Sequence, residues 1–211
     1  MTTLDSSWQQ TPEHWAPVPV DALRRAIAQA GEALDVVGED PVGRRLASYY
    51  DRADNFAGAT FADLPPLEPL DITATDLHAV SLLSVNVGPG ATRRFLEPGP
   101  ARSALLTKLR SVPDVELRAA GSDDFVAMAA FYDAVKMHLG EPTASSSDRW
   151  VTASKSCAPK RPYLFPVRDS VVRGFLGLTQ YSNYQVDWQV FRAMLSESTI
   201  VRAYDAAVAA A

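Results

Sequence analysis

Hydrophobic side chains recur at helical spacing along most of this chain. The clearest case is the segment 123–140, in which apolar residues from Phe125 to Leu139 return every three or four positions and Gly140 marks the end. Helices are also predicted over 22–37, 72–85, 103–112, 186–197 and 198–211, and the segment 85–96 is predicted to be a Gly-Pro-Gly turn that leads into a helix. The pattern predicts a mainly α fold, a compact helical bundle of about eight to ten helices with little strand.

Polar residues at the ends of these segments predict where helices begin. Asp21 is placed to cap the helix over 22–37, and Thr73 followed by Asp76 resembles a capping box. Between the first helices and Thr73, the chain is rich in Gly, Asp, Asn and Pro, which predicts a loop. That loop has room for one short strand around 59–61.

The N-terminal residues differ from the rest of the chain. Residues 1–19 are polar and interrupted by prolines, which predicts an extended arm. Trp8 and Trp15 are the side chains that would hold this arm to the body, because burial is the usual fate of an indole. Residues 20–211 are predicted to form a single α-helical domain, since a chain of this size commonly folds around one core.

Composition narrows the class of protein. A hydrophobic content of 47% and a formal net charge of −5 indicate a globular protein and argue against a general nucleic-acid coat protein. The single cysteine, Cys157, excludes an intramolecular disulfide and predicts a cytoplasmic location. No apolar run approaches the roughly 18 residues that span a bilayer. We therefore expect no membrane association. His14, His78 and His138 are widely separated and do not have the spacing of metal ligands, so we expect no metal, and we also expect no cofactor.

One short stretch carries charge of the opposite sign. Residues 149–173 hold six basic side chains and one acid, Asp169, and so carry +5 in a chain of net charge −5. A positive field keeps a carboxylate ionised and attracts an anionic partner. Asp169 is therefore the first candidate for chemistry.

The same stretch contains a recognisable order of motifs. Thr152 and Ala153 are followed by a helical segment, then by an extended apolar step that ends in Pro166 and leads through Val167 and Arg168 to Asp169, and then by Val172. In the extended step, Tyr163 and Phe165 alternate around Leu164, which predicts that they share one buried face or that either lines a pocket. This order of motifs resembles the helix-hairpin-helix DNA glycosylases, in which a hairpin Thr-Ala precedes a proline-containing step and the catalytic aspartate. The resemblance implies a helix-hairpin-helix-like unit near 144–177 and a catalytic role for Asp169.

Three positions depart from the glycosylase pattern. The two hairpin glycines, whose amides approach a DNA phosphate, are replaced by Ser147 and Arg149. The position of the Schiff-base lysine holds Val151, so the resemblance does not imply lyase chemistry by that residue.

A second resemblance covers most of the chain. It is carried by the stretch TASK…KRP…PV.DSVV within 152–172, by Tyr49-Tyr50-Asp51 and by the helix DLHAVSLLSV over 76–85. These segments resemble a bacterial family of uncharacterised proteins. This second resemblance implies no known activity.

Asp169 has two compatible interpretations. It precedes an apolar helical run, which is the usual place of an N-cap residue. As a catalytic carboxylate, it would stabilise the positive charge that builds on a sugar when an N-glycosidic bond breaks, and it would activate water. The nucleobase to be released would first have to leave the base stack of the DNA and enter a pocket of the protein.

Eight further residues are candidates for ligand binding. Lys155, Lys160 and Arg161 either end a helix in solvent or bind an anion, whereas Arg168 and Arg173 would keep Asp169 charged and bind phosphates. The others are Trp150, which either anchors the core or stacks on a ligand, and, as second-tier candidates, Tyr50 and Asp51. Lys155 and Lys160 would also lower the pKa of the Cys157 thiol if they lie close to it in space.

The sequence leaves three functions open. The first is a glycosylase-like hydrolase that binds DNA or another nucleotide-bearing ligand, with Asp169 as its catalytic group. The second is an enzyme that reuses the same scaffold and pocket for an anionic small molecule, which the acidic net charge and the absent hairpin glycines favour. The third is a non-catalytic binding module in which Asp169 only caps a helix. The oligomeric state is not predicted.

Overall fold

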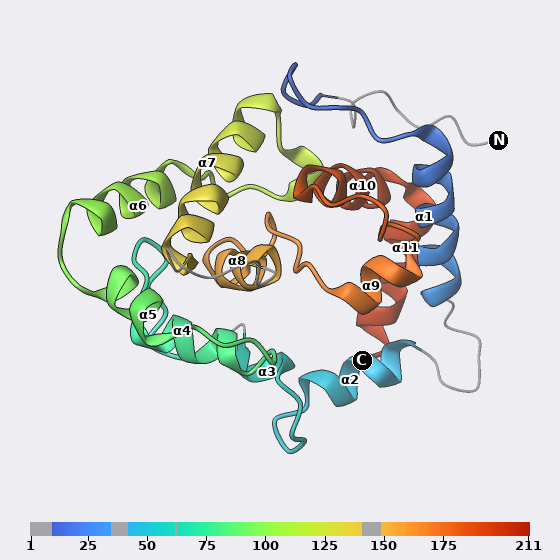
Figure 1. Cartoon of the computed structure of the whole chain (residues 1–211). Helices are drawn as coiled ribbons and strands as arrows, with labels where there is room; N and C mark the ends of the chain where they lie inside the picture. Colours follow the sequence, from blue (N-terminus) through green and yellow to red (C-terminus); the bar gives the residue numbers. More distant parts are fainter. Residues whose placement is uncertain (1–9, 35–41, 62, 141–148) are drawn as a thin grey trace. The chain divides into compact units, whose positions relative to one another are not determined.

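The computed structural model of this protein is built from helices. It describes residues 10–34, 42–61, 63–140 and 149–211, which form eleven α-helices and no β-strand (Figure 1). The predicted mainly α class is therefore confirmed. No helix in this described part of the chain is both long and apolar enough to cross a lipid bilayer. The helices are α1 (Val20–Ala33), α2 (Val42–Tyr50), α3 (Gly58–Phe61), α4 (Ala74–Ser81), α5 (Pro89–Leu96), α6 (Pro100–Ser111), α7 (Ser122–Leu139), α8 (Arg149–Cys157), α9 (Ser170–Phe175), α10 (Tyr184–Ser196) and α11 (Ser198–Ala209), with 3₁₀ turns η2 (Leu117–Ala119) and η3 (Ala158–Lys160).

The chain divides into two compact units. Unit 1 comprises Met1–Ala59, Leu117–Ala119 and Arg168–Ala211, and unit 2 comprises Thr60–Glu116 and Ala120–Val167. Helices α1, α2, α9, α10 and α11 belong to unit 1, whereas α4 to α8 belong to unit 2. The single domain expected over 20–211 stays a prediction.

Unit 1 is organised around α1, which contacts α10 and α11. The buried side chains of α1 recur at helical spacing and meet apolar residues that follow or belong to α9, α10 and α11. Helix α2 contacts α11. The approach is close at Gly43, where an added Cβ atom would lie only 2.8 Å from Cβ of Ala210, the residue that follows α11. The core of unit 1 is formed by Val18, Ala22, Leu23, Ala26, Ala30, Leu176, Leu178, Val190, Ala193 and Ile200.

The described part of the N-terminal arm is attached to α10. The ring of Trp15 is buried and lies 6.0 Å from that of Trp188, centroid to centroid. Gln189 donates a hydrogen bond to the carbonyl oxygen of Ala16, and Arg192 donates one to the carbonyl oxygen of Gln10. Trp15 thus holds the arm as predicted, while Trp8 lies outside the described residues.

Unit 2 is organised around α7, the longest helix of the described chain. Helix α7 contacts α5, α6 and α8, and its buried side chains return every three or four residues from Phe125 to His138. The ring of Phe131 lies 6.1 Å from that of Phe165, and the ring of Phe95 lies 5.3 Å from that of His138. This spacing is the one that predicted the helix over 123–140, and Gly140 ends it as expected.

Helix ends confirm some predictions and correct others. Thr73 and Asp76 form the predicted capping box, with the amide of Thr73 donating to Asp76 Oδ2 over 2.7 Å. Asp21 is not a cap, because the helix begins one residue before it and Pro19 occupies the N-cap position. The short strand expected around 59–61 is also wrong, since this stretch belongs to α3. Strand ladders need a partner strand, and none lies among the described residues.

The predicted helix-hairpin-helix-like unit is not confirmed. Its two helices belong to different compact units, α8 to unit 2 and α9 to unit 1, and residues 144–148 lie outside the described residues. The extended step expected before Pro166 is wrong for residues 161–165. There the amides of Leu164 and Phe165 both donate to the carbonyl oxygen of Arg161 at 3.0 Å, which makes a turn.

Candidate functional site

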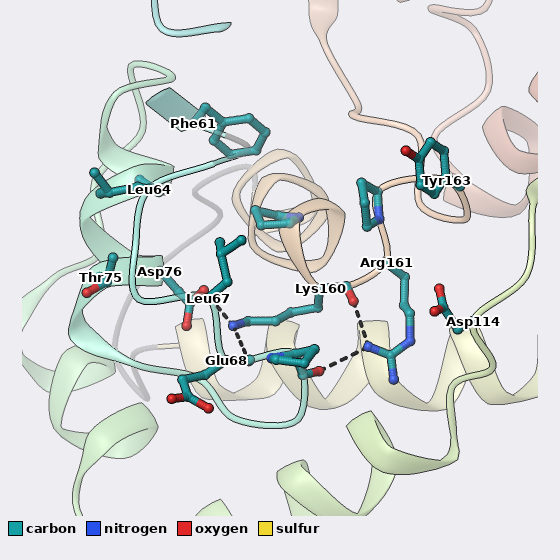
Figure 2. A pocket seen from close by; sticks show the side chains of 14 residues that line it. Phe61, Leu64, Leu67, Glu68, Thr75, Asp76, Asp114, Lys160, Arg161 and Tyr163 are labelled. Atoms are coloured by element: carbon teal, nitrogen blue, oxygen red, sulfur yellow. Dashed lines mark hydrogen bonds and ion pairs between the residues drawn. The ribbon is translucent and has the colours of Figure 1, made fainter. Parts of the chain in front are cut away.

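Unit 2 contains a pocket of about 340 Å³ (Figure 2). Its walls come from the end of α3, the loop that follows it, α4, the loop after α6, and the turn after η3. The lining residues are Phe61, Leu64, Leu67, Glu68, Pro69, Thr75, Asp76, Ala79, Asp114, Pro159, Lys160, Arg161, Pro162 and Tyr163. Lys160 and Arg161, two of the predicted ligand-binding residues, are thus brought to one cavity.

The pocket has an apolar mouth. Leu67 and Tyr163 expose 60% and 74% of their surface, although both line the cavity. Phe61 and Leu64 are half-buried and add further apolar wall. Water therefore meets several large hydrophobic side chains at one place.

The turn after η3 explains why Tyr163 points outward. Pro159 lies in η3, and the two hydrogen bonds that the amides of Leu164 and Phe165 donate to the Arg161 carbonyl oxygen reverse the chain immediately afterwards. Leu164 and Phe165 turn into the core and are almost fully buried, which leaves Tyr163 on the surface beside the pocket. The expectation that Tyr163 and Phe165 share one face of an extended step fails for this reason.

Lys160 crosses the floor of the pocket and ends at a carboxylate. Its Nζ lies 2.5 Å from Oδ1 of Asp76 and donates to the carbonyl oxygen of Glu68 at 2.9 Å (Figure 2). The side chain of Lys160 is 3% exposed and that of Asp76 is 16% exposed. Asp76 also accepts two hydrogen bonds from Thr73, so the capping box of α4 holds the acceptor for Lys160 in place.

Arg161 is fully occupied by main-chain acceptors. A guanidinium has five N–H donors. In Arg161 they make five hydrogen bonds, and the acceptors are the carbonyl oxygens of Pro69, Leu109, Val112 and Lys160. Leu109 and Val112 lie at the C-terminal end of α6, where unpaired carbonyls favour a cation. The side chain therefore ties the turn to the end of α6.

Lys155 also lies in the interior of unit 2. It is buried on α8, and its Nζ donates to the carbonyl oxygen of Leu83 over 2.8 Å. Leu83 follows α4, so Lys155 connects α8 to the turn after that helix. Sequence reasoning placed Lys155 on a solvated helix end or at an anion site, and the structure gives it a carbonyl partner instead.

Arg168 and Arg173 converge on a carboxylate that the sequence analysis missed. In unit 1, Asp187 Oδ2 lies 2.7 Å from Nε of Arg168, and Oδ1 lies 3.1 Å from Nε of Arg173. Both arginines also donate to carbonyl oxygens of the loop before α10, at Ser182 and at Leu178 and Tyr181. Burial raises the pKa of Asp187 above its ordinary value, although the two guanidinium groups act in the opposite direction.

One signal for Asp187 is present in the sequence. The residue lies on the apolar side of α10, in line with the buried Val190. An acid at such a position indicates a buried partner, because an unpaired interior charge is costly. The partners themselves are not readable from the spacing, since both precede Asp187 across a loop.

Asp169 occupies the N-cap position of α9. Its Oδ1 accepts hydrogen bonds from the amides of Val171 at 2.8 Å and Val172 at 3.3 Å. The cap interpretation is confirmed, and the catalytic interpretation stays a prediction. The residue belongs to unit 1 and is not among those that line the pocket of unit 2.

The remaining candidates lie apart from the pocket lining. The Trp150 ring stacks on Tyr132 at 5.8 Å and carries Nζ of Lys136 over its face at 2.9 Å from the centroid. Tyr50 is exposed in unit 1 and meets the edge of Tyr49, and Asp51 accepts from the amide of Ala53. Trp150 thus has the contacts of a packing anchor.

Cys157 is embedded in unit 2. It is fully buried, and burial raises the pKa of its thiol well above the ordinary value, with Asp133 acting in the same direction. The expectation that neighbouring lysines lower this pKa is wrong, because Lys155 donates to a carbonyl oxygen and Lys160 pairs with Asp76. Within the described ranges, no group of three or more His, Cys, Asp or Glu side chains is arranged to hold a metal ion.

No curated protein and no solved structure matches this chain. The profile of the Family of unknown function (DUF6308) matches residues 42–211, a span that contains all of unit 2 and most of the helices of unit 1. By this match over most of its length, the chain belongs to the Family of unknown function (DUF6308).

Proposed function

We propose that this protein binds a small organic molecule in the pocket of unit 2. The observation that carries the proposal is a cavity of about 340 Å³ with apolar walls and a few fixed polar groups. Small-molecule sites in proteins typically have volumes of roughly 300–1,000 Å³ and this composition. The function is the binding of a ligand, and any chemistry on it would need a further group at the same place.

The exposed mouth of the pocket supports the proposal. Leu67 and Tyr163 leave large apolar surfaces in water beside a hollow. Burying apolar surface stabilises a complex by about 25 cal/mol per Å². A ligand that reached from the floor to these two side chains would recover this free energy, whereas the unoccupied protein does not.

The contacts of the basic residues favour a pocket ligand over a DNA-binding face. Binding to a phosphate backbone needs cations that reach the surface. Here Lys155, Lys160 and Arg161 are buried and donate to carbonyl oxygens or to Asp76. A glycosylase-like activity at Asp169 stays a prediction, and it draws no support from these three cations.

Binding of neutral aromatic probes tests the proposal. We expect saturable binding of indole, followed by chemical shifts of the protein in NMR spectra. Leu67→Ala should weaken binding about fivefold, because it removes apolar contact at the mouth. Leu70→Ala is the matched control, since Leu70 lies three residues further along the same loop, is 50% exposed and does not line the pocket.

Two results would contradict the proposal. One is the absence of saturable binding for indole, for its hydroxyethyl derivative tryptophol and for its charged aminoethyl and carboxymethyl derivatives, tryptamine and indole-3-acetate. The other is an equal loss of affinity in Leu67→Ala and Leu70→Ala. Circular dichroism spectra should be the same for both variants, since each side chain is largely exposed.

A further inference from the structure

We infer that the pocket of unit 2 selects a ligand with a positively charged group on an apolar body, such as an alkylamine that carries an aromatic ring. The inference deepens the proposed function and rests on it. It differs from both interpretations of the sequence, in which Lys160 and Arg161 either end a helix in solvent or bind an anion. The reason is that both cations are already satisfied within the protein, whereas two carboxylates at the same pocket are not.

The charge of Lys160 is balanced inside the pocket. Its ammonium lies 2.5 Å from the carboxylate of Asp76 and is almost completely buried. A second donor is taken by the carbonyl oxygen of Glu68. An anionic ligand would have to compete with a carboxylate that the capping box of α4 fixes in position.

Arg161 has no donor left for a ligand. All five N–H groups are paired with carbonyl oxygens of unit 2, and two of those carbonyls belong to the C-terminal end of α6. Bidentate recognition of a carboxylate or phosphate by arginine needs two free N–H groups on one edge. Arg161 therefore shapes the pocket without offering an anion site.

The charged side chains that line the pocket sum to −1, because three carboxylates (Glu68, Asp76 and Asp114) stand against two cations (Lys160 and Arg161). Glu68 and Asp114 line it and are exposed, and neither carboxylate has an ion-pair partner among the residues that the structure describes. Figure 2 shows them on either side of the Lys160 and Arg161 side chains. Asp76 is paired with Lys160, and Arg161 is buried. The exposed charges at this rim are therefore those of Glu68 and Asp114, and they favour a ligand of positive charge.

The aromatic walls favour the same class of ligand. Phe61 and Tyr163 line the pocket, and the face of an aromatic ring attracts a cation. A primary alkylamine remains protonated at pH 7, because its pKa is near that of lysine. An amine on an aromatic body would thus meet apolar wall, aromatic faces and free carboxylates together.

Three probes with one indole body test the inference. They are tryptamine, which is cationic, tryptophol, which is neutral, and indole-3-acetate, which is anionic. We expect affinity to fall in that order in isothermal titration at low salt. The advantage of tryptamine over tryptophol should shrink as salt is raised, because exposed carboxylates are screened.

Variants that neutralise one carboxylate at a time test whether Glu68 and Asp114 cause the preference for tryptamine. Glu68→Gln and Asp114→Asn should each weaken tryptamine binding by about threefold and leave tryptophol binding unchanged. Glu97→Gln is the control, because Glu97 is exposed in unit 2 and does not line the pocket. All three side chains are exposed, so the fold should tolerate the changes.

The outcomes separate the inference from the proposed function. Equal binding of tryptamine and tryptophol, or tighter binding of indole-3-acetate, would overturn the charge preference while the binding function stands. A preference for tryptamine that is as large in both pocket variants as in the unmodified protein would also overturn it. Failure of all three probes to bind would remove the proposed function, and the inference with it.

Discussion

At the scale of single residues, side chains that look alike in the sequence have different partners in the structure. Lys160 and Arg161 are adjacent and both basic, yet one pairs with Asp76 and the other uses every donor on carbonyl oxygens. A basic stretch suggests an anion site only while its donors are free. Burial converts these cations into internal connectors, as it does for Lys155.

Burial also determines the chemistry of Cys157. Because the folded state raises its thiol pKa, the native protein keeps the proton at a pH where the unfolded chain, with a pKa near 9.0, releases it. The native thiol should resist iodoacetamide at pH 8, whereas the chain unfolded in urea should react readily. The thiol contribution to stability should fall as pH rises above about 9, since unfolding then releases a proton. Fast alkylation of the native protein, followed by mass spectrometry, would contradict this prediction.

At the scale of elements, polar side chains at helix ends determine which elements of the fold are held together. The capping box of α4 also holds the acceptor for Lys160, and Arg161 pairs with the last carbonyls of α6. The loop before α10 is held by Arg168 and Arg173, which Asp187 keeps in place. One polar side chain at a helix end thus positions an element that is distant in sequence.

The cap of α9 makes a testable case. Asp169→Ala should lower the free energy of unfolding by about 1 kcal/mol, because the amides of Val171 and Val172 lose their acceptor. Asp169→Asn should retain nearly all of that stability, since asparagine caps about as well. Urea denaturation followed by circular dichroism measures both. Equal losses in the two variants would show that the carboxylate charge, and not its cap geometry, stabilises this region.

At the scale of the whole molecule, a local charge count is a poor guide to the partner. The window 149–173 carries +5, but Lys155, Lys160, Arg161 and Arg168 in it are buried. These four cations add little positive charge to the surface, and the chain as a whole has a net charge of −5. A polyanion therefore meets far less positive surface than the sequence suggests.

Duplex DNA binding distinguishes this view from the glycosylase hypothesis. We expect no binding in fluorescence anisotropy at about 50 mM salt, because few phosphates could be neutralised. Tight binding that weakens with a log–log salt slope of roughly −0.9 per neutralised phosphate would contradict the expectation. Loss of that binding or of base excision in Asp169→Asn would then support the glycosylase hypothesis.

The sequence predicts what depends on local spacing. The helix over 123–140, its stop at Gly140, the Thr73–Asp76 box and the cap at Asp169 all involve residues a few positions apart, and all are confirmed. The pocket depends on long-range pairing instead. Nζ of Lys160 meets a carbonyl 92 residues away, and no periodicity in the chain encodes such a contact.

The five hydrogen bonds of Arg161 have a consequence for any molecule that enters beside it. They fasten the segment that carries Tyr163 to the rest of unit 2 before anything binds. This wall of the pocket therefore has its final shape before a ligand binds, and little binding free energy is lost in ordering the segment. The affinity of a ligand should therefore depend on how well its shape fits this wall. The protein itself should contribute the same small ordering cost to the binding of a rigid ligand and of a flexible one.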